Sequence, residues 1–233
     1  MSNIRLFFQE SLSINLSSNL NRHQSHYLTK VMRIKPGENF SLFNETGEWQ
    51  AKINEISKGI VKFSIIKKLR EKNKELDLWL AFTPIKSNYF NFMIQKATEL
   101  GVTKFIPIIS ERTIVRKINT DRLKKIIIEA TEQSDSLLLP KLEDCKTLKG
   151  VLNNWDKERL IIFCDEKLRV DKPFKLNKSQ KVAIFIGPVG GWSIKERELF
   201  ENINHNKISL GENVLKVDTA AIVALAKIKG LLI

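Results

Sequence analysis

The chain has 233 residues, of which 42% are hydrophobic and 28% are charged, so it is long enough for one large or two modest globular domains rather than a long disordered segment. Its formal net charge of +13 at pH 7 favours a polyanionic partner such as nucleic acid, although a genome that overuses lysine would give the same excess. We expect a cytoplasmic protein without a membrane span or a metal site, because the chain shows no signal peptide, no long apolar run and no cysteine cluster.

The first part of the chain, residues 1–72, carries the alternating pattern of short strands separated by glycine turns, which predicts a small β-barrel. It holds 12 Lys and Arg against 6 Asp and Glu, so it is the denser positive surface of the chain. The charged residues 67–75 are either a linker to the next domain or a solvated extension of the last strand. Strands are expected at residues 4–8, 40–43, 51–56 and 61–65.

The second part, residues 73–233, alternates helical periodicity with buried strands. Ser193 and Glu196 have the spacing of a capping box, which fixes the start of a helix. This alternation indicates an α/β fold whose mostly parallel sheet has helices on both faces. Helices are expected on the apolar face of residues 90–100, after a Thr120 cap and over residues 219–232, and strands at 102–109, 160–164 and 182–186.

Two glycine-bearing loops, residues 186–193 and 209–221, each leave a predicted strand and enter a predicted helix. Ligands of open α/β sheets bind at such turns, where bare backbone can approach them closely. The spacing of Gly187, Gly190 and Gly191 does not match the dinucleotide fingerprint, and no phosphate-binding Gly-Lys-Ser/Thr is present, so nucleotide triphosphates and NAD are disfavoured. One such loop alone is often only a tight turn, but two about twenty residues apart predict the walls of one pocket, suited to a cationic cofactor.

These loops resemble those of the RsmE-type ribosomal RNA uridine N3-methyltransferases of the knotted SPOUT superfamily. The family's Gly-Pro-Glu-Gly-Gly loop is similar to residues 187–191, and its Leu-Gly-x-x-Ile/Val-Leu-Arg-x-Glu-Thr-Ala loop is similar to residues 210–220. The similarity continues upstream, at His26-Tyr27-Leu28-Thr29-Lys30-Val31-Met32-Arg33, at residues 94–102, at Ser110-Glu111-Arg112 and at Glu132-Gln133-Ser134.

The resemblance implies a PUA-like RNA-binding β-barrel over residues 1–72 and a methyltransferase domain with a trefoil knot over residues 73–233. It also implies a homodimer that binds S-adenosylmethionine in three loops of the knot and acts on ribosomal RNA or the small ribosomal subunit. The cofactor-binding residues it implies are Phe163, Cys164, Asp165, Gly187, Pro188, Val189, Gly190, Gly191, Leu210, Gly211, Val214, Leu215, Lys216, Val217, Thr219 and Ala220.

Methylation of uracil N3 requires loss of the N3 proton, helped by a base or by a cation that stabilises the developing anion. By the resemblance Lys216 stands where the family has arginine, and we predict that it is this cation. RNA is expected to be bound by Arg5, His26, Lys30, Arg33 and Trp49 on the barrel and by Lys86 and Arg112 beside the site.

Val189 and Asp218 replace two glutamates of the family loops, and Lys216 replaces the arginine. These departures keep an alternative open, an RNA-binding ribosome assembly factor with weakened or lost activity. A ribose 2′-O or guanosine N1 methyltransferase is a further alternative within the knotted group, and the barrel segment around His26 argues against it.

Overall fold

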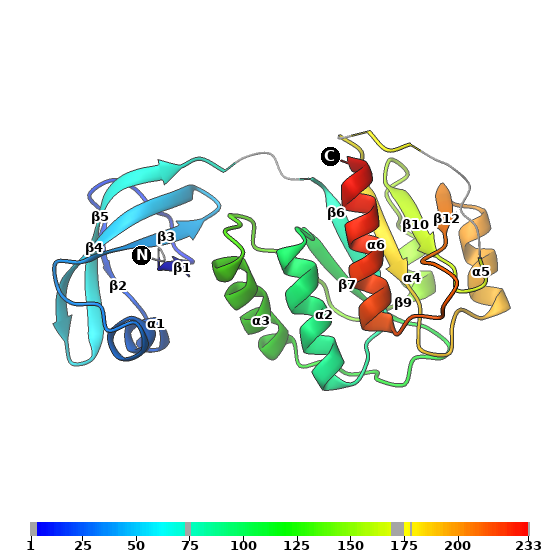
Figure 1. The fold of residues 1–233 in the computed structure, drawn as a ribbon, viewed down its shortest axis with the longest axis horizontal. Coiled ribbons are helices and arrows are strands. Elements are labelled where there is room, and N and C mark those ends of the chain that lie inside the picture. Colours follow the sequence, from blue (N-terminus) through cyan, green and yellow to red (C-terminus); the bar gives the residue numbers. More distant parts are fainter. Residues whose placement is uncertain (1–3, 73–75, 169–174, 178, 233) are drawn as a thin grey trace. The chain divides into compact units, whose positions relative to one another are not determined.

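The computed structural model describes residues 4–72, 76–168, 175–177 and 179–232. The chain forms two compact units: residues 1–74 with 131–139 make up the first, and residues 75–130 with 140–233 the second (Figure 1). The segment 131–139, which follows far along the chain, thus belongs with the N-terminal barrel strands.

The first unit is a sheet of mostly antiparallel strands in the order β1-β3-β4-β5-β2, with β1 parallel to β3. Its core is apolar and includes Leu28, Phe40 and Phe63. The expected strands are confirmed, whereas β2 was not predicted because its Ser-Ser-Asn sequence has no apolar alternation. The elements are β1 (Arg5–Phe7), β2 (Ser17–Asn19), α1 (Arg22–His26), the π-helix η1 (Tyr27–Val31), β3 (Asn39–Asn44), β4 (Gly47–Ser57) and β5 (Ile60–Arg70).

The charged tract 67–75 begins as a strand, because β5 continues to Arg70. Its last residues, 73–75, lie outside the described part of the chain. The extension places Arg70 beside Glu48 of β4, whose side chain is buried. A strand can continue beyond its alternating apolar residues where its terminal charged residue pairs with an opposite charge on the neighbouring strand, as Arg70 does with Glu48.

A buried ion-pair network ties segment 131–139 to the barrel strands. The Glu48 carboxylate accepts a hydrogen bond from Arg5 Nε at 3.1 Å and one from Arg70 Nε at 2.6 Å. Arg5 also donates to the carbonyl oxygens of Glu132 and Ser136, and Arg70 donates to Asp135. Burial acts to lower the pKa of Arg70, but the hydrogen bonds and charges of Glu48 and Asp135 outweigh it and raise that pKa, so the guanidinium stays charged.

The second unit is an all-parallel sheet in the order β12-β10-β11-β6-β7-β8, with β9 pairing the far end of β7. This confirms the predicted α/β class and the strands 160–164 and 182–186. The elements are β6 (Leu78–Phe82), α2 (Ser87–Glu99), β7 (Lys104–Ile109), α3 (Thr120–Gln133), β8 (Lys141–Leu142), β9 (Lys146–Thr147), α4 (Leu148–Leu152), β10 (Leu160–Cys164), β11 (Val182–Ile186), α5 (Ile194–Glu201), β12 (His205–Ile208) and α6 (Val217–Leu232).

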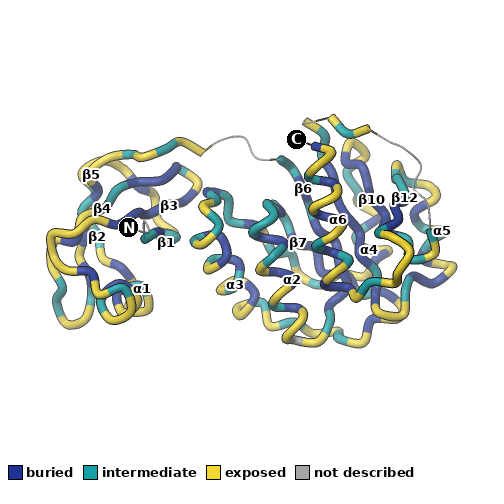
Figure 2. The backbone as a smooth tube through the Cα atoms, viewed as in Figure 1, coloured by how far each residue is buried: buried dark blue, intermediate teal, exposed yellow. Residues whose placement is uncertain are grey.

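Helices cover both faces of this sheet, so its central strands are buried along their whole length (Figure 2). On one face, Phe163 of β10 and Phe185 of β11 pack with Phe200 of α5 in an aromatic cluster. On the other face, Phe82 of β6 packs edge-on against Phe90 of α2, with ring centres 5.5 Å apart. Continuous apolar strand sequences are what such two-sided burial requires.

Two helix ends differ from the sequence prediction, and one agrees. Asn119 caps α3 in place of Thr120, since its Oδ1 accepts the Arg122 N–H at 3.0 Å. The last helix begins at Val217, two residues earlier than expected. The Ser193–Glu196 capping box at α5 is confirmed.

We predict that Glu48→Gln lowers the free energy of unfolding by about 3 to 5 kcal/mol, because it removes the buried carboxylate of the network and leaves Arg5 only the exposed Asp135 as its countercharge. Glu55→Gln is the matched control, since Glu55 lies on the same strand in an exposed pair with Lys62 and should cost less than about 1 kcal/mol. Denaturant unfolding of both variants measures the difference. Equal losses would show that the network contributes no more than a surface ion pair.

Candidate functional site

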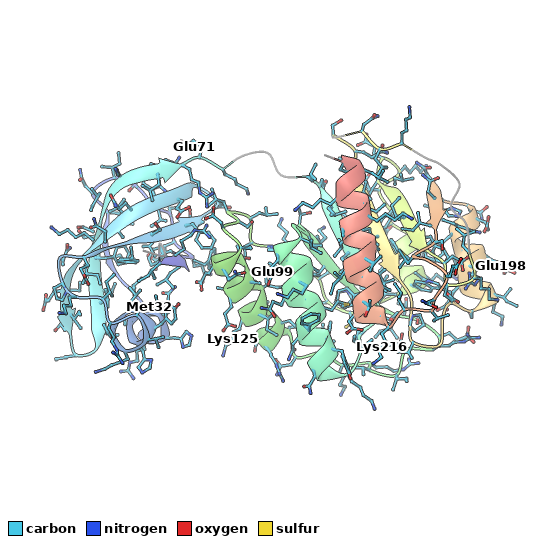
Figure 3. The ribbon with its side chains drawn as sticks, in the orientation of Figure 1. Met32, Glu71, Glu99, Lys125, Glu198 and Lys216 are labelled. Carbon is cyan, nitrogen blue, oxygen red and sulfur yellow. The ribbon has the colours of Figure 1, made fainter. Side chains whose placement is uncertain are left out.

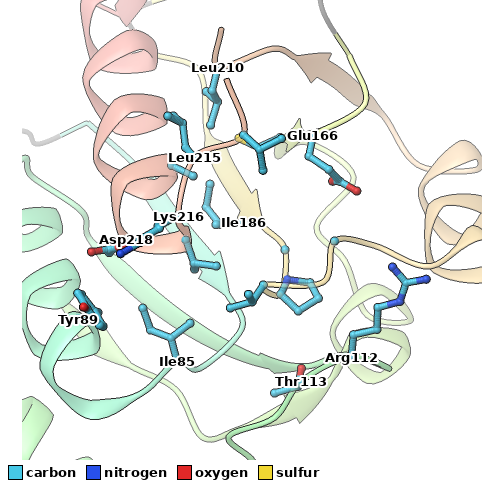
Figure 4. A pocket seen from close by; sticks show the side chains of 18 of the residues that line it. Ile85, Tyr89, Arg112, Thr113, Glu166, Ile186, Leu210, Leu215, Lys216 and Asp218 are labelled. Carbon is cyan, nitrogen blue, oxygen red and sulfur yellow. The ribbon is translucent and has the colours of Figure 1, made fainter. Parts of the chain in front are cut away.

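A cavity of about 570 Å³ lies in the second unit at the carboxyl edge of the parallel sheet (Figure 4). Its walls are the loops that follow β6, β7, β10, β11 and β12, together with the first turns of α2 and α6. Parallel strands all end at the same edge, so loops far apart in the sequence meet there. The volume suits a small-molecule ligand.

Most of the predicted cofactor-binding residues line this cavity. Cys164 and Asp165 follow β10, the glycine loop follows β11, and the remaining residues follow β12. Three do not line it: Phe163 is in the aromatic cluster below, Gly190 packs against Arg112, and Thr219 is exposed on α6. Those that line it are Cys164, Asp165, Gly187, Pro188, Val189, Gly191, Leu210, Gly211, Val214, Leu215, Lys216, Val217 and Ala220.

The cavity also has walls that the sequence analysis did not assign. They come mainly from the loop after β6, which adjoins β11 in the sheet, and the loop after β7, which adjoins β6. Only the strand order shows that these loops share the edge, although Thr83-Pro84 directly after a buried strand was a usable signal. The additional lining residues outside the two predicted loops are Pro84, Ile85, Tyr89, Thr113, Ile114, Val115, Glu166 and Leu168. Ile186, Asn213 and Asp218 also line the cavity and lie within those loops, although they were not named as cofactor-binding residues.

The glycine loop after β11 needs its glycines for two separate reasons. A Cβ on Gly187 would lie 2.7 Å from Nε1 of the buried Trp192 indole. Gly191 has φ +70°, the left-handed conformation that closes the turn through its N–H to the Pro188 carbonyl at 2.8 Å. Side chains at these positions would distort the cavity wall.

Glu196 holds this loop to the loop after β7. One carboxylate oxygen accepts the Ser193 N–H at 2.9 Å in the capping box, and the other accepts the Glu111 N–H at 2.8 Å. Arg112 then donates to the carbonyl of Gly190. A single buried carboxylate therefore fixes both the start of α5 and the turn that carries Arg112 and Thr113 to the cavity.

Carboxylates form one end of the cavity. Arg197 of α5 donates to Asp165 Oδ1 and to Glu166 Oε1, each at 2.5 Å, and so orients both acids. Each carboxylate keeps a second oxygen free of that contact, and Glu166 remains a third exposed. The carboxylates can bind the positive charge of a cationic ligand, and the neighbouring glycine main chain can form hydrogen bonds with its polar atoms.

Lys216 lies at the other end of the cavity, directly before α6 (Figures 3 and 4). Its Nζ is 5.1 Å from the centre of the Tyr89 ring, within the range of a cation–π contact. Asp218, on the first turn of α6, is buried and lines the same cavity. The cavity thus has an acidic end near Glu166 and a cationic, aromatic end near Lys216 (Figure 4).

Five of the seven predicted RNA-binding residues lie where RNA could reach them. Lys86 and Arg112 line the cavity, and His26, Lys30 and Arg33 are exposed on or beside α1 and η1 in the first unit.

The prediction that Arg5 and Trp49 bind RNA is wrong, because both side chains are buried in the barrel unit. The Arg5 guanidinium is used by Glu48 and main-chain carbonyls, and the Trp49 indole donates to Thr46 Oγ1 at 3.1 Å. Neither side chain is available to a phosphate or a base.

Comparison with known proteins identifies the family. Residues 72–229 match the model of an RNA methyltransferase domain, and residues 20–66 match that of an RNA methyltransferase PUA domain. The chain belongs to the RNA methyltransferase family. It is 34% identical to ribosomal RNA small subunit methyltransferase E of Rickettsia conorii, over 94% of this chain and 91% of the relative. The corresponding Synechocystis protein is 30% identical over 98% of this chain and 78% of its own length.

Solved structures agree with this membership over the whole chain. The small subunit methyltransferase E of Neisseria gonorrhoeae, crystallised with S-adenosylmethionine, superposes with a TM-score of 0.90 at 26% identity, covering 98% of both chains. A Legionella pneumophila methyltransferase with the same bound cofactor gives a TM-score of 0.86 at 29% identity, covering 99% of this chain and 98% of the other.

Two negative findings concern the described residues alone. Within them, no helix is both long and apolar enough to cross a membrane. The same residues contain no cluster of three or more His, Cys, Asp or Glu side chains that could hold a metal ion.

We predict that Gly187→Ala lowers the free energy of unfolding by about 1 to 3 kcal/mol, because the new Cβ overlaps a buried indole that the aromatic cluster holds in place. Gly190→Ala is the control on the same loop. Its Cβ would meet only the flexible Arg112 side chain, at 3.2 Å, so a change below about 1 kcal/mol is expected. Thermal unfolding of the two variants compares them, and equal stability would contradict the close approach at Trp192.

Proposed function

We propose that this protein transfers a methyl group from S-adenosylmethionine to N3 of a uridine in 16S ribosomal RNA. The observation that carries the proposal is the cavity at the sheet edge, whose glycine loop and carboxylates suit a sulfonium nucleoside. The relatives named ribosomal RNA small subunit methyltransferase E, and the superposable structures with bound cofactor, support the same assignment.

The residues present fit the cofactor chemically. The backbone of residues 187–191 and 210–215 offers amides and carbonyls, and Asp165 and Glu166 offer negative charge. Gly187, Gly191 and Gly211 in these segments leave main chain open to a ligand. When bound there, S-adenosylmethionine supplies an activated methyl group. The task of the protein is then to align the acceptor nitrogen and to exclude water.

Lys216 is proposed as the group that stabilises the uracil anion while N3 loses its proton. It lines the cavity, its ammonium is exposed, and its position directly before α6 leaves it free to turn toward an incoming base. A positioned cation acts most strongly where negative charge develops in the transition state.

The departures from the family loops do not close the cavity. Val189 is 75% exposed at its rim, so the missing glutamate leaves open space rather than a blocked pocket. Glu166 Oε1 lies 2.3 Å from the position that a Cβ on Gly191 would take, so a neighbouring loop already brings a carboxylate to the glycine loop. Nothing in this geometry favours an assembly factor without activity.

The barrel unit is proposed to bind the RNA backbone through His26, Lys30 and Arg33. Residues 22–33, which carry them, include no acidic residue, and all three side chains are exposed. Lysine and arginine gain affinity for RNA by releasing its counterions. The slope of RNA affinity against salt concentration measures this contribution.

Three finer features remain predictions of the resemblance: the trefoil knot, the homodimer and the cytoplasmic location. The homodimer is supported by α6, whose exposed side carries Val223, Ala226 and Leu231. An exposed apolar helix stripe is typical of a subunit interface. Sedimentation of the purified chain checks its mass against the 26.9 kDa monomer.

We expect the purified protein with S-adenosylmethionine to form N3-methyluridine in 16S ribosomal RNA taken from a strain that lacks this gene. Lys216→Met should lower kcat by roughly 100-fold, and Lys216→Arg should recover most of it, because the charge is retained. Lys195→Met, an exposed lysine of α5, is the matched control. Nucleoside mass spectrometry identifies the product, and cofactor binding without any methylated uridine would support the assembly-factor alternative.

A further inference from the structure

Tyr89 is a large aromatic residue of the cavity that is exposed to solvent. It lies in the first turns of α2, lines the cavity and is 52% exposed. Two other residues that line the cavity are also large, apolar and exposed, Ile114 at 78% and Val214 at 74%. Exposed apolar groups around a cavity mark a surface that a ligand covers.

The cationic partner of Tyr89 is the residue proposed to assist the chemistry. Lys216 Nζ rests 5.1 Å from the ring centre, and Tyr89, Lys216 and Asp218 lie together at one end of the cavity (Figure 4). Glu166 and Arg112 lie toward the other end, beside the glycine loop (Figure 4). The carboxylates suit the cationic cofactor. The aromatic end of the cavity therefore remains for the base that accepts the methyl group.

We infer that Tyr89 is the stacking platform for the target pyrimidine, an inference that rests on the proposed function. The base lies on the phenol ring at the place where the Lys216 ammonium rests in the free protein. The ammonium moves from the ring to a carbonyl oxygen of the base, where it stabilises the anion that forms as N3 releases its proton to solvent. N3 would then bond to the methyl group of the bound cofactor as the methyl–sulfur bond breaks. Tyr89 is a substrate-positioning residue in this arrangement, because it contacts the substrate base and takes no proton.

Three physical points favour this exchange. A flat π-face stacks on any base, and such stacking contributes substantially to the binding of unpaired nucleotides. An exposed cation–π contact is weak, so the ammonium leaves the ring at little cost. The ring also holds Lys216 within the cavity before RNA arrives, which reduces the disorder that substrate binding must remove.

The chain contains a matched control on the same helix. Phe92 is three residues along α2, is 47% exposed and has Lys96 Nζ 5.9 Å from its ring centre, yet it does not line the cavity. Tyr89→Leu and Phe92→Leu therefore remove equivalent exposed rings, each with a lysine above it. Only the first removes a ring from the cavity.

The test is steady-state methylation of 16S ribosomal RNA by wild type, Tyr89→Leu, Tyr89→Phe and Phe92→Leu, with S-adenosylmethionine binding measured by calorimetry. We expect Tyr89→Leu to lower kcat/KM for RNA by roughly tenfold or more. Tyr89→Phe and Phe92→Leu should stay within about threefold of wild type, since both keep the ring in the cavity. The Kd for S-adenosylmethionine should be unchanged in all of them.

Each other outcome overturns a defined statement. Tyr89→Leu with normal kcat/KM, or Phe92→Leu with an equal loss, would contradict the stacking role. Tyr89→Phe as impaired as Tyr89→Leu would assign the function to the hydroxyl, and a weakened cofactor Kd would place Tyr89 at the cofactor instead. Wild-type protein that methylates no ribosomal RNA would contradict the proposed function itself, whatever the variants do.

Discussion

The parallel arrangement of the sheet in the second unit is the constraint on which the site depends. Because β6, β7, β10, β11 and β12 all run the same way, the loops that follow them meet at one edge. The loops after β10 and β11 leave fully buried strands, so their first residues have little freedom to move. The cavity is therefore formed by main chain held at rigid ends, and preorganisation of this kind is what alignment of a methyl donor requires.

Rigid strand ends alone do not fix the loops, and Glu196 supplies the rest. Its two oxygens accept main-chain N–H groups from Ser193 and Glu111, on the loops after β11 and β7. Two main-chain N–H donors stabilise the negative charge of a buried carboxylate even when no cation pairs with it. Glu196, which caps the start of α5, thus also determines where Arg112 and Thr113 meet the cavity. A capping residue that is recognisable in the sequence therefore also shapes the site.

Features encoded within a few residues could be predicted, and features that depend on strand order could not. The Ser193–Glu196 capping box was evident from its spacing, and the strands 160–164 and 182–186 from their apolar runs. Tyr89 and Thr113 were missed as cavity residues because nothing local shows that β6 lies beside β11 in the sheet and that β7 lies beside β6. Arg5 was misassigned since the segment 131–139, which buries its guanidinium, is more than a hundred residues away.

The distribution of charge within the cavity accounts for the separation of its two ends. A sulfonium donor and a lysine that stabilises an anion are both cationic, so a site that held them together would weaken the binding of each. The acids oriented by Arg197 lie at the glycine loop, whereas Lys216 rests on the Tyr89 ring at the far end. The ring quadrupole attracts that ammonium at the end of the cavity that the buried Asp218 also lines. Replacement of Tyr89 by an acid would pair Lys216 permanently, and the cation would then be lost to the reaction while the fold of the cavity remained.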